Sequence, residues 1–181
     1  MTPERTHPTI GACGIDCGLC PRFHTDGSSR CPGCCGAGFD RVHPSCVIVT
    51  CCVKKRSLQT CAECQEHPCA IFDRPATLRD SFVTHRCMRA NQEAIRRDGL
   101  DAFAEAQAER LALLEEMLAR FDDGRSKSVY SLASALLSVD GLRQAVDAVP
   151  SDGDVKTRAK QLRIKLEAVA ATEKVTLALN R

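Results

Sequence analysis

The stretch that decides the fold is Cys13-Gly-Ile-Asp-Cys17-Gly-Leu-Cys20, followed by Cys31-Pro-Gly-Cys34, Cys46-x4-Cys51 and Cys61-Ala-Glu-Cys64-x4-Cys69. Three of these steps are Cys-x2-Cys, a spacing that lets two thiolates of one tight turn face a single metal ion. All 13 cysteines of the 181-residue chain lie in its first half. A short segment with few aromatic residues cannot easily build its own core. We therefore expect metal coordination to hold it together.

Ten cysteines fall within this pattern, and all ten are candidate metal ligands. All-thiolate tetrahedral coordination is typical of structural zinc, and we expect about two zinc ions. A [4Fe–4S] cluster is the alternative, because such clusters also take four thiolates and Pro21 follows Cys20 as in ferredoxins. The candidate ligands are Cys13, Cys17, Cys20, Cys31, Cys34, Cys46, Cys51, Cys61, Cys64 and Cys69.

The other cysteines and two histidines are expected to lie outside the coordination spheres. Cys35 and Cys52 directly follow candidate ligands, and adjacent side chains rarely reach one metal together, so they are spare or second-choice ligands. Cys87 is expected on a helix as a small core residue. His43 and His67 each precede a proline close to a candidate cysteine. Either imidazole could replace a thiolate, but a place beside the metal or in solvent is favoured.

The expected fold class is an irregular metal-stabilised cysteine-rich domain at residues 1–72, followed by a mainly α-helical bundle at residues 73–181. Glycine and proline interrupt the first part, where Val47-Ile48-Val49 is the one β-branched run and predicts a short strand or extended leg. A first helix is predicted from Pro75 to Gly99, with Leu78, Phe82 and Ile95 on its apolar face.

Three further helices are predicted from apolar stripes. One covers Asp101 to Phe121, where apolar residues repeat at steps of three and four. The next starts near Val129, breaks near Asp140-Gly141 and ends at Pro150. The last begins after a cap at Ser151 or Asp152. Its stripe consists of Val155, Ala159, Leu162, Leu166 and Val169.

Composition and charge limit the partners and the cellular location that we expect for this protein. The formal charge of +2 gives no global reason to expect nucleic acid or an anionic membrane as a partner. The first ten residues are polar, and no apolar run approaches the roughly 20 residues of a membrane span. We therefore expect a cytoplasmic location, where cysteine pairs bind metal rather than form disulfides. Lys54-Lys55-Arg56 is a local basic spot without stacking aromatics, so nucleic acid is not the expected partner.

Three functions remain open. The first is a zinc-stabilised interaction or adaptor module with an unknown protein partner. The second is an iron–sulfur redox or sulfur-handling protein, and the third is a nucleic-acid-binding zinc protein. No catalytic residue is predicted, because the sequence has no nucleotide-binding glycine motif, catalytic triad or helical His-Glu-x-x-His pattern. A radical S-adenosylmethionine enzyme would match Cys13-x3-Cys17-x2-Cys20, but the chain is too short for the usual barrel. Whether the protein is an enzyme stays open.

The cysteine pattern, with His67-Pro68 before its last member, resembles an uncharacterised bacterial and archaeal family, domain of unknown function 3795. The resemblance extends through Asn91-x3-Ile95-x3-Gly99-Leu100 to Phe121-Asp-Asp-Gly124-Arg125 and covers roughly residues 10–140. It implies a metal-binding cysteine domain with no established reaction. Cys35 and Cys52 are not part of that family's pattern.

Overall fold

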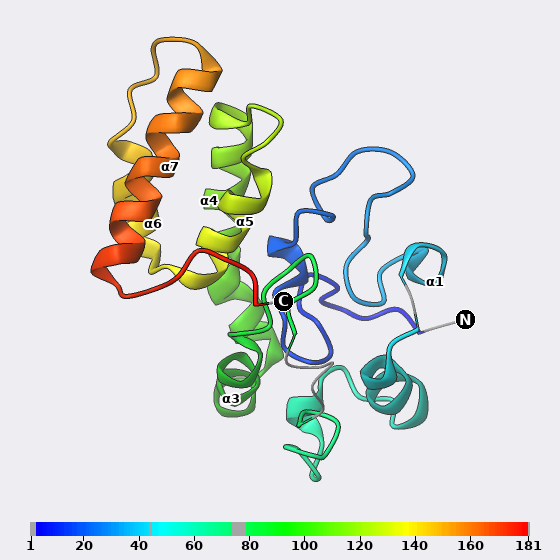
Figure 1. Ribbon diagram of the computed structural model, residues 1–181. Coiled ribbons are helices and arrows are strands. Elements are labelled where there is room, and N and C mark those ends of the chain that lie inside the picture. The colour runs from blue at the N-terminus through cyan, green and yellow to red at the C-terminus, as the bar shows by residue number, and fades with distance from the viewer. Residues whose placement is uncertain (1–2, 44, 74–78, 181) are drawn as a thin grey trace. The chain divides into compact units, whose positions relative to one another are not determined.

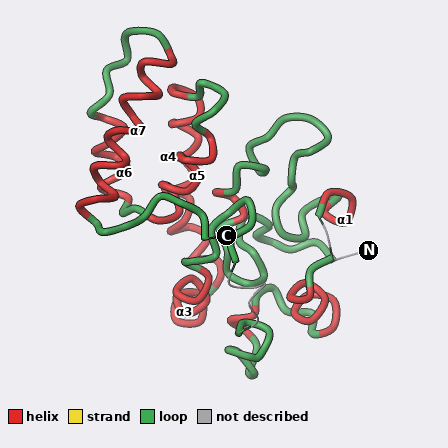
Figure 2. The backbone as a smooth tube through the Cα atoms, viewed as in Figure 1, coloured by secondary structure: helices red, strands yellow, loops and turns green. Residues whose placement is uncertain are grey.

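The computed structural model describes residues 3–43, 45–73 and 79–180. Within these ranges the regular elements are helices, and no strand is present beyond one isolated bridge between Ile10 and Asp16. Figure 2 shows helices and loops and no strand in the described parts of the chain. The chain forms two compact units, Met1–Ala106 with Asn180–Arg181, and Gln107–Leu179. The two units meet between Ala106 and Gln107, inside the helix Leu100–Phe121. The sequence predicted a domain boundary between residues 72 and 73. The mainly helical, cysteine-rich character is confirmed.

The first unit begins with short helical turns between loops. These are the 3-10 turns η1 (Cys17–Leu19) and η3 (Cys61–Glu63), helix α1 (Phe39–Val42) and the π-helix η2 (Val49–Lys55). Cysteines begin both 3-10 turns, and both turns end one residue before the second cysteine of a Cys-x2-Cys step. Each short turn therefore carries the two cysteines of one Cys-x2-Cys step at its ends.

The strand predicted at Val47-Ile48-Val49 is wrong, because Val47 and Ile48 are helical and lead into η2. The side chains of Ile48, Val49, Cys52 and Val53 are all buried, and their spacing of one and four residues is that of a helix face. Burial of that face overrides the weak strand preference of β-branched residues.

The main hydrophobic cluster of the first unit contains more cysteine than aromatic residues. Its buried members lie between residues 12 and 88, and four of them are cysteines while two are phenylalanines. The buried set is Ala12, Cys34, Cys35, Phe39, Ile48, Val49, Cys52, Val53, Cys61, Phe72 and Met88.

Helix α3 (Met88–Asp98) is shorter than predicted. Pro75 and Leu78 lie outside the described residues, and residues 79–87 are not helical. There the Asp80 carboxylate accepts a hydrogen bond from the backbone N–H of His85 at 2.6 Å, and this local bonding competes with a helix. Phe82 is 61% exposed rather than in the core, whereas Ile95 is buried as predicted. Cys87 lies at the N-cap position of α3 and is half-buried.

The second unit is a helical bundle. The helix predicted at Asp101 to Phe121 is confirmed as α4 (Leu100–Phe121), whose part from Gln107 onward belongs to this unit. It is followed by α5 (Lys127–Leu136), α6 (Val139–Asp147) and α7 (Val155–Thr172). Helices α6 and α7 lie side by side (Figure 1). Fully buried side chains fill the bundle: Leu114, Met117, Phe121, Tyr130, Leu142, Leu162 and Leu166.

Two helix boundaries in this unit differ from the prediction. The break lies at Leu137–Ser138 instead of Asp140-Gly141, and the Ser138 hydroxyl caps α6 by accepting from the Gly141 N–H at 3.0 Å. Asp154, not Ser151 or Asp152, caps α7 and accepts from two backbone N–H groups. No helix in the described part of the chain is long and apolar enough to cross a membrane.

Candidate metal centre

Four of the ten predicted ligands line one small cavity in the first unit. Cys51 comes from η2, Cys61 and Cys64 flank the η3 turn, and Cys69 follows in the next loop. The cavity has a volume of about 30 Å³, which is enough for a single ion or water molecule. The remaining lining residues are Ile48, Cys52, Arg56, Glu66, His67, Ile71 and Phe72.

The Cys61–Cys64 turn is fixed by hydrogen bonds that do not involve its two thiols. The Thr60 hydroxyl accepts from the Ala62 N–H at 2.8 Å, and the Glu63 carboxylate accepts from the Thr60 N–H at 3.2 Å. This reciprocal capping box closes the turn at its start. The Cys64 N–H then donates to the Cys61 carbonyl at 3.0 Å. A short, rigid turn of this kind is what a Cys-x2-Cys metal knuckle requires.

Helix α3 also holds this loop. The Arg96 guanidinium donates to the carbonyl oxygens of Ala62, Cys64 and His67, at 3.1, 3.1 and 3.2 Å. One side chain therefore fixes three points of the segment that carries two predicted ligands. Arg96 was not identified from the sequence, where it is one of several charged residues near the end of a helix.

A second group of predicted ligands surrounds Cys34. The Cys17 and Cys34 thiols are hydrogen-bonded, and the hydrogen bond raises the pKa of Cys17 above its ordinary value, with burial as the next cause. The Cys34 sulfur lies 3.9 Å from that of Cys35 and accepts from the Ala12 N–H at 3.4 Å. Hydrogen bonds from Cys17 and Cys35 hold the pKa of Cys34 well below its ordinary value.

Cys13 and Cys46 belong to the same neighbourhood. Burial, followed by the charge of Cys34, raises the pKa of Cys13 to about 12, and the charge of Cys46 acts in the same direction. Buried thiols this close cannot all ionise without a cation, because each thiolate disfavours the next. A bound metal ion reverses this, since it stabilises every thiolate that coordinates it.

Cys20 and Cys31 form a third neighbourhood. Burial is the main cause that raises the pKa of Cys20, and the charge of Cys31 adds to it. The Cys31 N–H donates to the Arg22 carbonyl at 2.9 Å, which joins the two ends of the loop between these cysteines. The charge of Cys20 also reaches Cys17. The structure thus distributes the ten predicted ligands over three neighbourhoods.

In none of these neighbourhoods are the side chains in coordination geometry. Across the described ranges, no group of three or more His, Cys, Asp or Glu side chains is arranged to hold a metal ion. All 13 cysteines are free thiols. The structure therefore gathers the predicted ligands without placing any three of them around one point.

Cys35 and Cys52, which the sequence treated as spare, lie inside the core with the predicted ligands. They are 1% and 2% exposed. Cys35 has a left-handed backbone with φ of 60°, which is unusual for a residue with a side chain. A hydrogen bond with Cys61 lowers the pKa of Cys52.

The two histidines differ in position. His43 is exposed and stacks on Phe39, with ring centroids 4.5 Å apart. His67 lines the cysteine cavity, and its buried Nδ1 has no hydrogen-bond partner among the described residues. Burial, followed by the positive charges of Arg96 and Arg89, lowers the pKa of His67 and favours the neutral ring.

Sequence reasoning missed a buried arginine and a polar network. Arg5 is only 5% exposed, although the sequence predicted nothing for the polar residues before Cys13. Asn91 and Gln92 are buried between Met88 and Ile95 on α3. The sequence did contain a signal for Asn91 and Gln92, because both amides lie on the apolar face of the predicted helix. A polar group at such a position needs a buried hydrogen-bond partner. Arg5 offered no such signal.

The basic spot after Cys52 is partly neutralised. Lys54 lies 3.8 Å from the Asp40 carboxylate, and Arg56 lies 2.6 Å from that of Glu66. Both acidic partners are remote in sequence, so the pairs were not apparent from the local run of charge. The field that this run presents to a nucleic acid is correspondingly reduced.

No protein-family model, curated protein or solved structure matches this chain. The resemblance of its cysteine pattern to the uncharacterised family therefore stays a prediction. Any functional assignment depends on the cysteine neighbourhoods themselves.

Proposed function

We propose that the protein binds zinc through cysteine thiolates, that the metal maintains the fold of its first unit, and that the domain acts as an interaction module. The observation that carries this proposal is the cavity of about 30 Å³ lined by Cys51, Cys61, Cys64 and Cys69. These residues come from three separate segments, so their convergence is not a consequence of local spacing. A cavity of this size suits an ion, not an organic substrate.

The donor set suits a soft, tetrahedral ion. Four thiolates are the ligands of a closed structural zinc site, in which no position is left for water or substrate. The apolar walls formed by Ile48, Ile71 and Phe72 exclude solvent from the sulfurs. The thiols must turn toward a common centre when an ion binds, because no three ligating side chains of the described residues share one. Thiolate-saturated zinc is a poor Lewis acid, which supports a structural role.

The core composition supports a structural role for the metal. Cysteines make up four of the eleven buried members of the first unit's main hydrophobic cluster, and the regular elements before α3 are single turns or slightly longer. Such a segment gains little from secondary structure alone, and a thiolate-bound ion adds on the order of 10 kcal/mol of folding free energy. We propose that the stabilised surface of this domain binds an unidentified protein partner.

The same donors are compatible with iron, which is the second candidate. The backbone N–H of Ala12 donates to the Cys34 sulfur, and bonds of this kind stabilise cluster thiolates as well as zinc thiolates. With a cluster bound, the protein would serve as a redox or sulfur-handling protein. The colour of the purified protein separates the two candidates, because iron–sulfur clusters absorb broadly in the visible range and zinc thiolates do not.

The test is metal analysis of anaerobically purified protein. We expect colourless protein with at least one zinc ion per chain, and Cys64→Ser should lower the zinc content because it removes a cavity thiolate. Cys87→Ser is the matched control, since Cys87 lies at the start of α3 and does not line the cavity. Fully reduced protein that takes up neither zinc nor iron would contradict the proposal. Brown, iron-containing protein would favour the second candidate.

A further inference from the structure

Arg5 buries a permanent positive charge in the first unit, and no acidic side chain of the described residues pairs with it. Its side chain is 5% exposed. Nη1 donates to the carbonyl oxygen of Ile10, whereas Nε and Nη2 are buried with no hydrogen-bond partner among the described residues. Arginine cannot release its proton in a protein, so burial does not neutralise it. A buried charge is strongly unfavourable unless an opposite charge accompanies it.

Cysteines surround the segment that carries this charge. Within the described residues, no ion pair links Arg5 to a carboxylate. The Cys34 N–H donates to the carbonyl oxygen of Pro8, three residues after Arg5, at 2.7 Å. Ala12, two residues after the Ile10 carbonyl that Arg5 binds, donates its N–H to the Cys34 sulfur at 3.4 Å and accepts from the Cys61 N–H at 2.9 Å. The backbone that holds Arg5 is therefore hydrogen-bonded both to the group around Cys34 and to the turn that carries Cys61.

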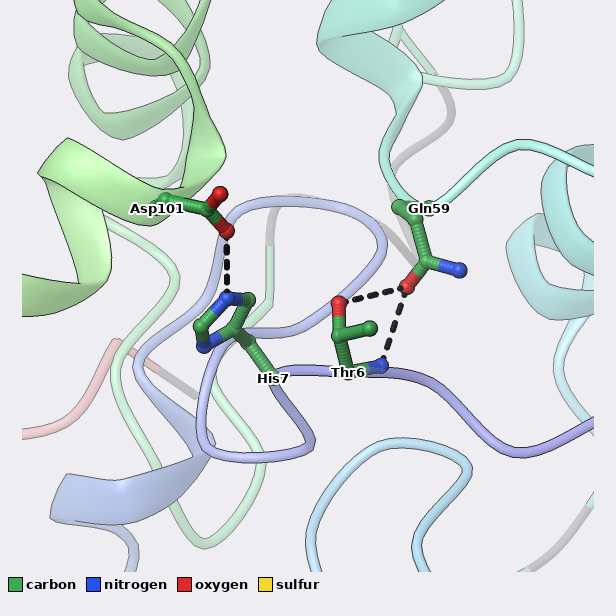
Figure 3. Close-up of polar contacts among 4 residues, drawn as sticks. All are labelled: Thr6, His7, Gln59 and Asp101. Carbon is green, nitrogen blue, oxygen red and sulfur yellow. Dashed lines mark hydrogen bonds and ion pairs between the residues drawn. The ribbon is translucent and has the colours of Figure 1, made fainter.

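The segment that carries Arg5 is fastened on its C-terminal side. The Thr6 backbone N–H and hydroxyl both donate to the side-chain oxygen of Gln59, at 3.2 and 3.3 Å. The His7 ring lies 2.7 Å from the Asp101 carboxylate, as Figure 3 shows. Gln59 also precedes the capped turn that carries Cys61 and Cys64. These contacts place the guanidinium at a defined point next to the cysteines.

We propose that Arg5 is the buried counter-cation of the metal–thiolate centre. This inference rests on the proposed function, because four thiolates around zinc form a dianion and only bound metal keeps buried thiolates ionised together. The guanidinium offsets part of that negative charge, and its two unpartnered nitrogens can donate to thiolate sulfurs. Neutral thiols carry no charge that could balance the buried guanidinium. Thiolates bound to zinc do carry such a charge, so the assignment explains why a cation is buried at this place. Arg5 is thus a positioning and charge-balancing residue, not a ligand.

The charge of Arg5 can be separated from its hydrogen bond by two substitutions. Arg5→Lys keeps a cation and a donor for the Ile10 carbonyl, while Arg5→Gln keeps a donor and removes the charge. Arg97→Gln is the matched control, because Arg97 is exposed on α3 and pairs with its neighbour Asp98. Zinc affinity is measured on the full chain by competition with a chromogenic chelator under reducing conditions.

We expect Arg5→Gln to weaken zinc binding 10- to 100-fold, the usual range for groups that support metal ligands. Arg5→Lys should lose clearly less affinity, and Arg97→Gln should match the wild type. Wild-type affinity in Arg5→Gln, or equal losses in Arg5→Gln and Arg5→Lys, would overturn the inference. If Arg5→Gln yields no soluble protein with zinc present, folding of Arg5→Lys supports the charge requirement, and failure of both variants contradicts it.

The controls distinguish this inference from the proposed function. If the wild type binds zinc tightly and Arg5→Gln does the same, only the role of Arg5 fails. If the wild type binds no metal through its cysteines, the proposed function fails first, and the role assigned to Arg5 falls with it. A cysteine-dependent zinc affinity in the wild type is therefore measured before any variant.

Discussion

The carbonyl oxygen of Ala12 accepts two hydrogen bonds, one from the side-chain amide of Gln92 at 3.1 Å and one from the backbone N–H of Cys61 at 2.9 Å. Gln92 is 1% exposed, and its side-chain oxygen also accepts from the Thr60 hydroxyl at 3.3 Å. Ala12 precedes the first predicted ligand and Thr60 precedes Cys61. One residue of α3 thus joins the backbone that precedes Cys13 to the side chain that precedes Cys61.

Loss of the Gln92 bonds should destabilise the first unit. Gln92→Met keeps the volume of the side chain but removes two buried hydrogen bonds, each of which contributes roughly 0.5–1.5 kcal/mol net. We expect the free energy of unfolding to fall by about 2 kcal/mol in zinc-loaded protein, measured by urea denaturation. Gln65→Met, at an exposed position, should change it by less than about 0.5 kcal/mol. Equal effects of the two substitutions would contradict the assigned role.

Metal removal should affect the two units differently. A strong chelator under reducing conditions should make residues 13–72 sensitive to protease, because the metal supplies much of that segment's stability. Residues 107–179 should resist, since their buried stripes contain no cysteine. Mass spectrometry of the fragments locates the cuts. An unchanged digestion pattern after verified metal loss would count against structural metal.

The sequence predicts a helix correctly where apolar residues repeat at helical spacing and all face the core. The stripe through Leu162 and Leu166 identified α7, because a long amphipathic helix can bury its face in only one way. The run Val47-Ile48-Val49 was misread because local strand preference is weaker than burial against the cysteine core. Phe82 was misassigned because no pattern reveals the side-chain bonds of Asp80 that interrupt the helix.

The sequence could predict which cysteines are candidate ligands, but it could not predict which of them lie together in space. Spacing singled out the ten thiols as candidate ligands, yet it could not show that Cys46 lies near Cys13 while Cys51, five residues later, lines the cavity with Cys61, Cys64 and Cys69. Short helical turns between loops decide that grouping, and they depend on tertiary contacts. Arg5 was unpredictable for the same reason, because an isolated arginine in a polar segment is normally exposed.

Close packing of α6 against α7 depends on Gly141. A Cβ at this position would lie 2.6 Å from a methyl carbon of Val169 and 2.7 Å from the Glu173 carboxylate. Gly141→Ala gains helix propensity, but the clash should outweigh it and lower the free energy of unfolding by about 1–2 kcal/mol. Gln144→Ala, exposed on the same helix, is the control for urea denaturation. A stabilised Gly141→Ala protein would show that the two helices can move apart without loss.

Acid should weaken the start of α7. Hydrogen bonds from the Thr157 side chain and from the backbone N–H groups of Thr157 and Lys156 lower the pKa of Asp154 below its ordinary 3.8. The capping contribution is therefore fully present above pH 3.8 and is lost as the pH falls through the lower value of the folded state. Asp154→Ala should reduce the melting temperature of the second unit at pH 7, and this difference should shrink as the pH falls below 3.8 and through the lowered pKa of Asp154. A pH-independent difference would contradict a carboxylate cap.

The last prediction separates ligands from neighbours within the cysteine cavity. Cys69 and His67 both line it, but four thiolates close a zinc site and leave no position for the ring. Cys69→Ser should therefore lower the zinc content and weaken the thiolate-to-metal absorption of the cobalt-substituted protein. His67→Gln should preserve both, since four thiolates would complete the coordination without the half-buried ring. If His67→Gln loses the ion or shifts the cobalt spectrum as strongly as Cys69→Ser, the imidazole is a ligand and one of the four cysteines is not.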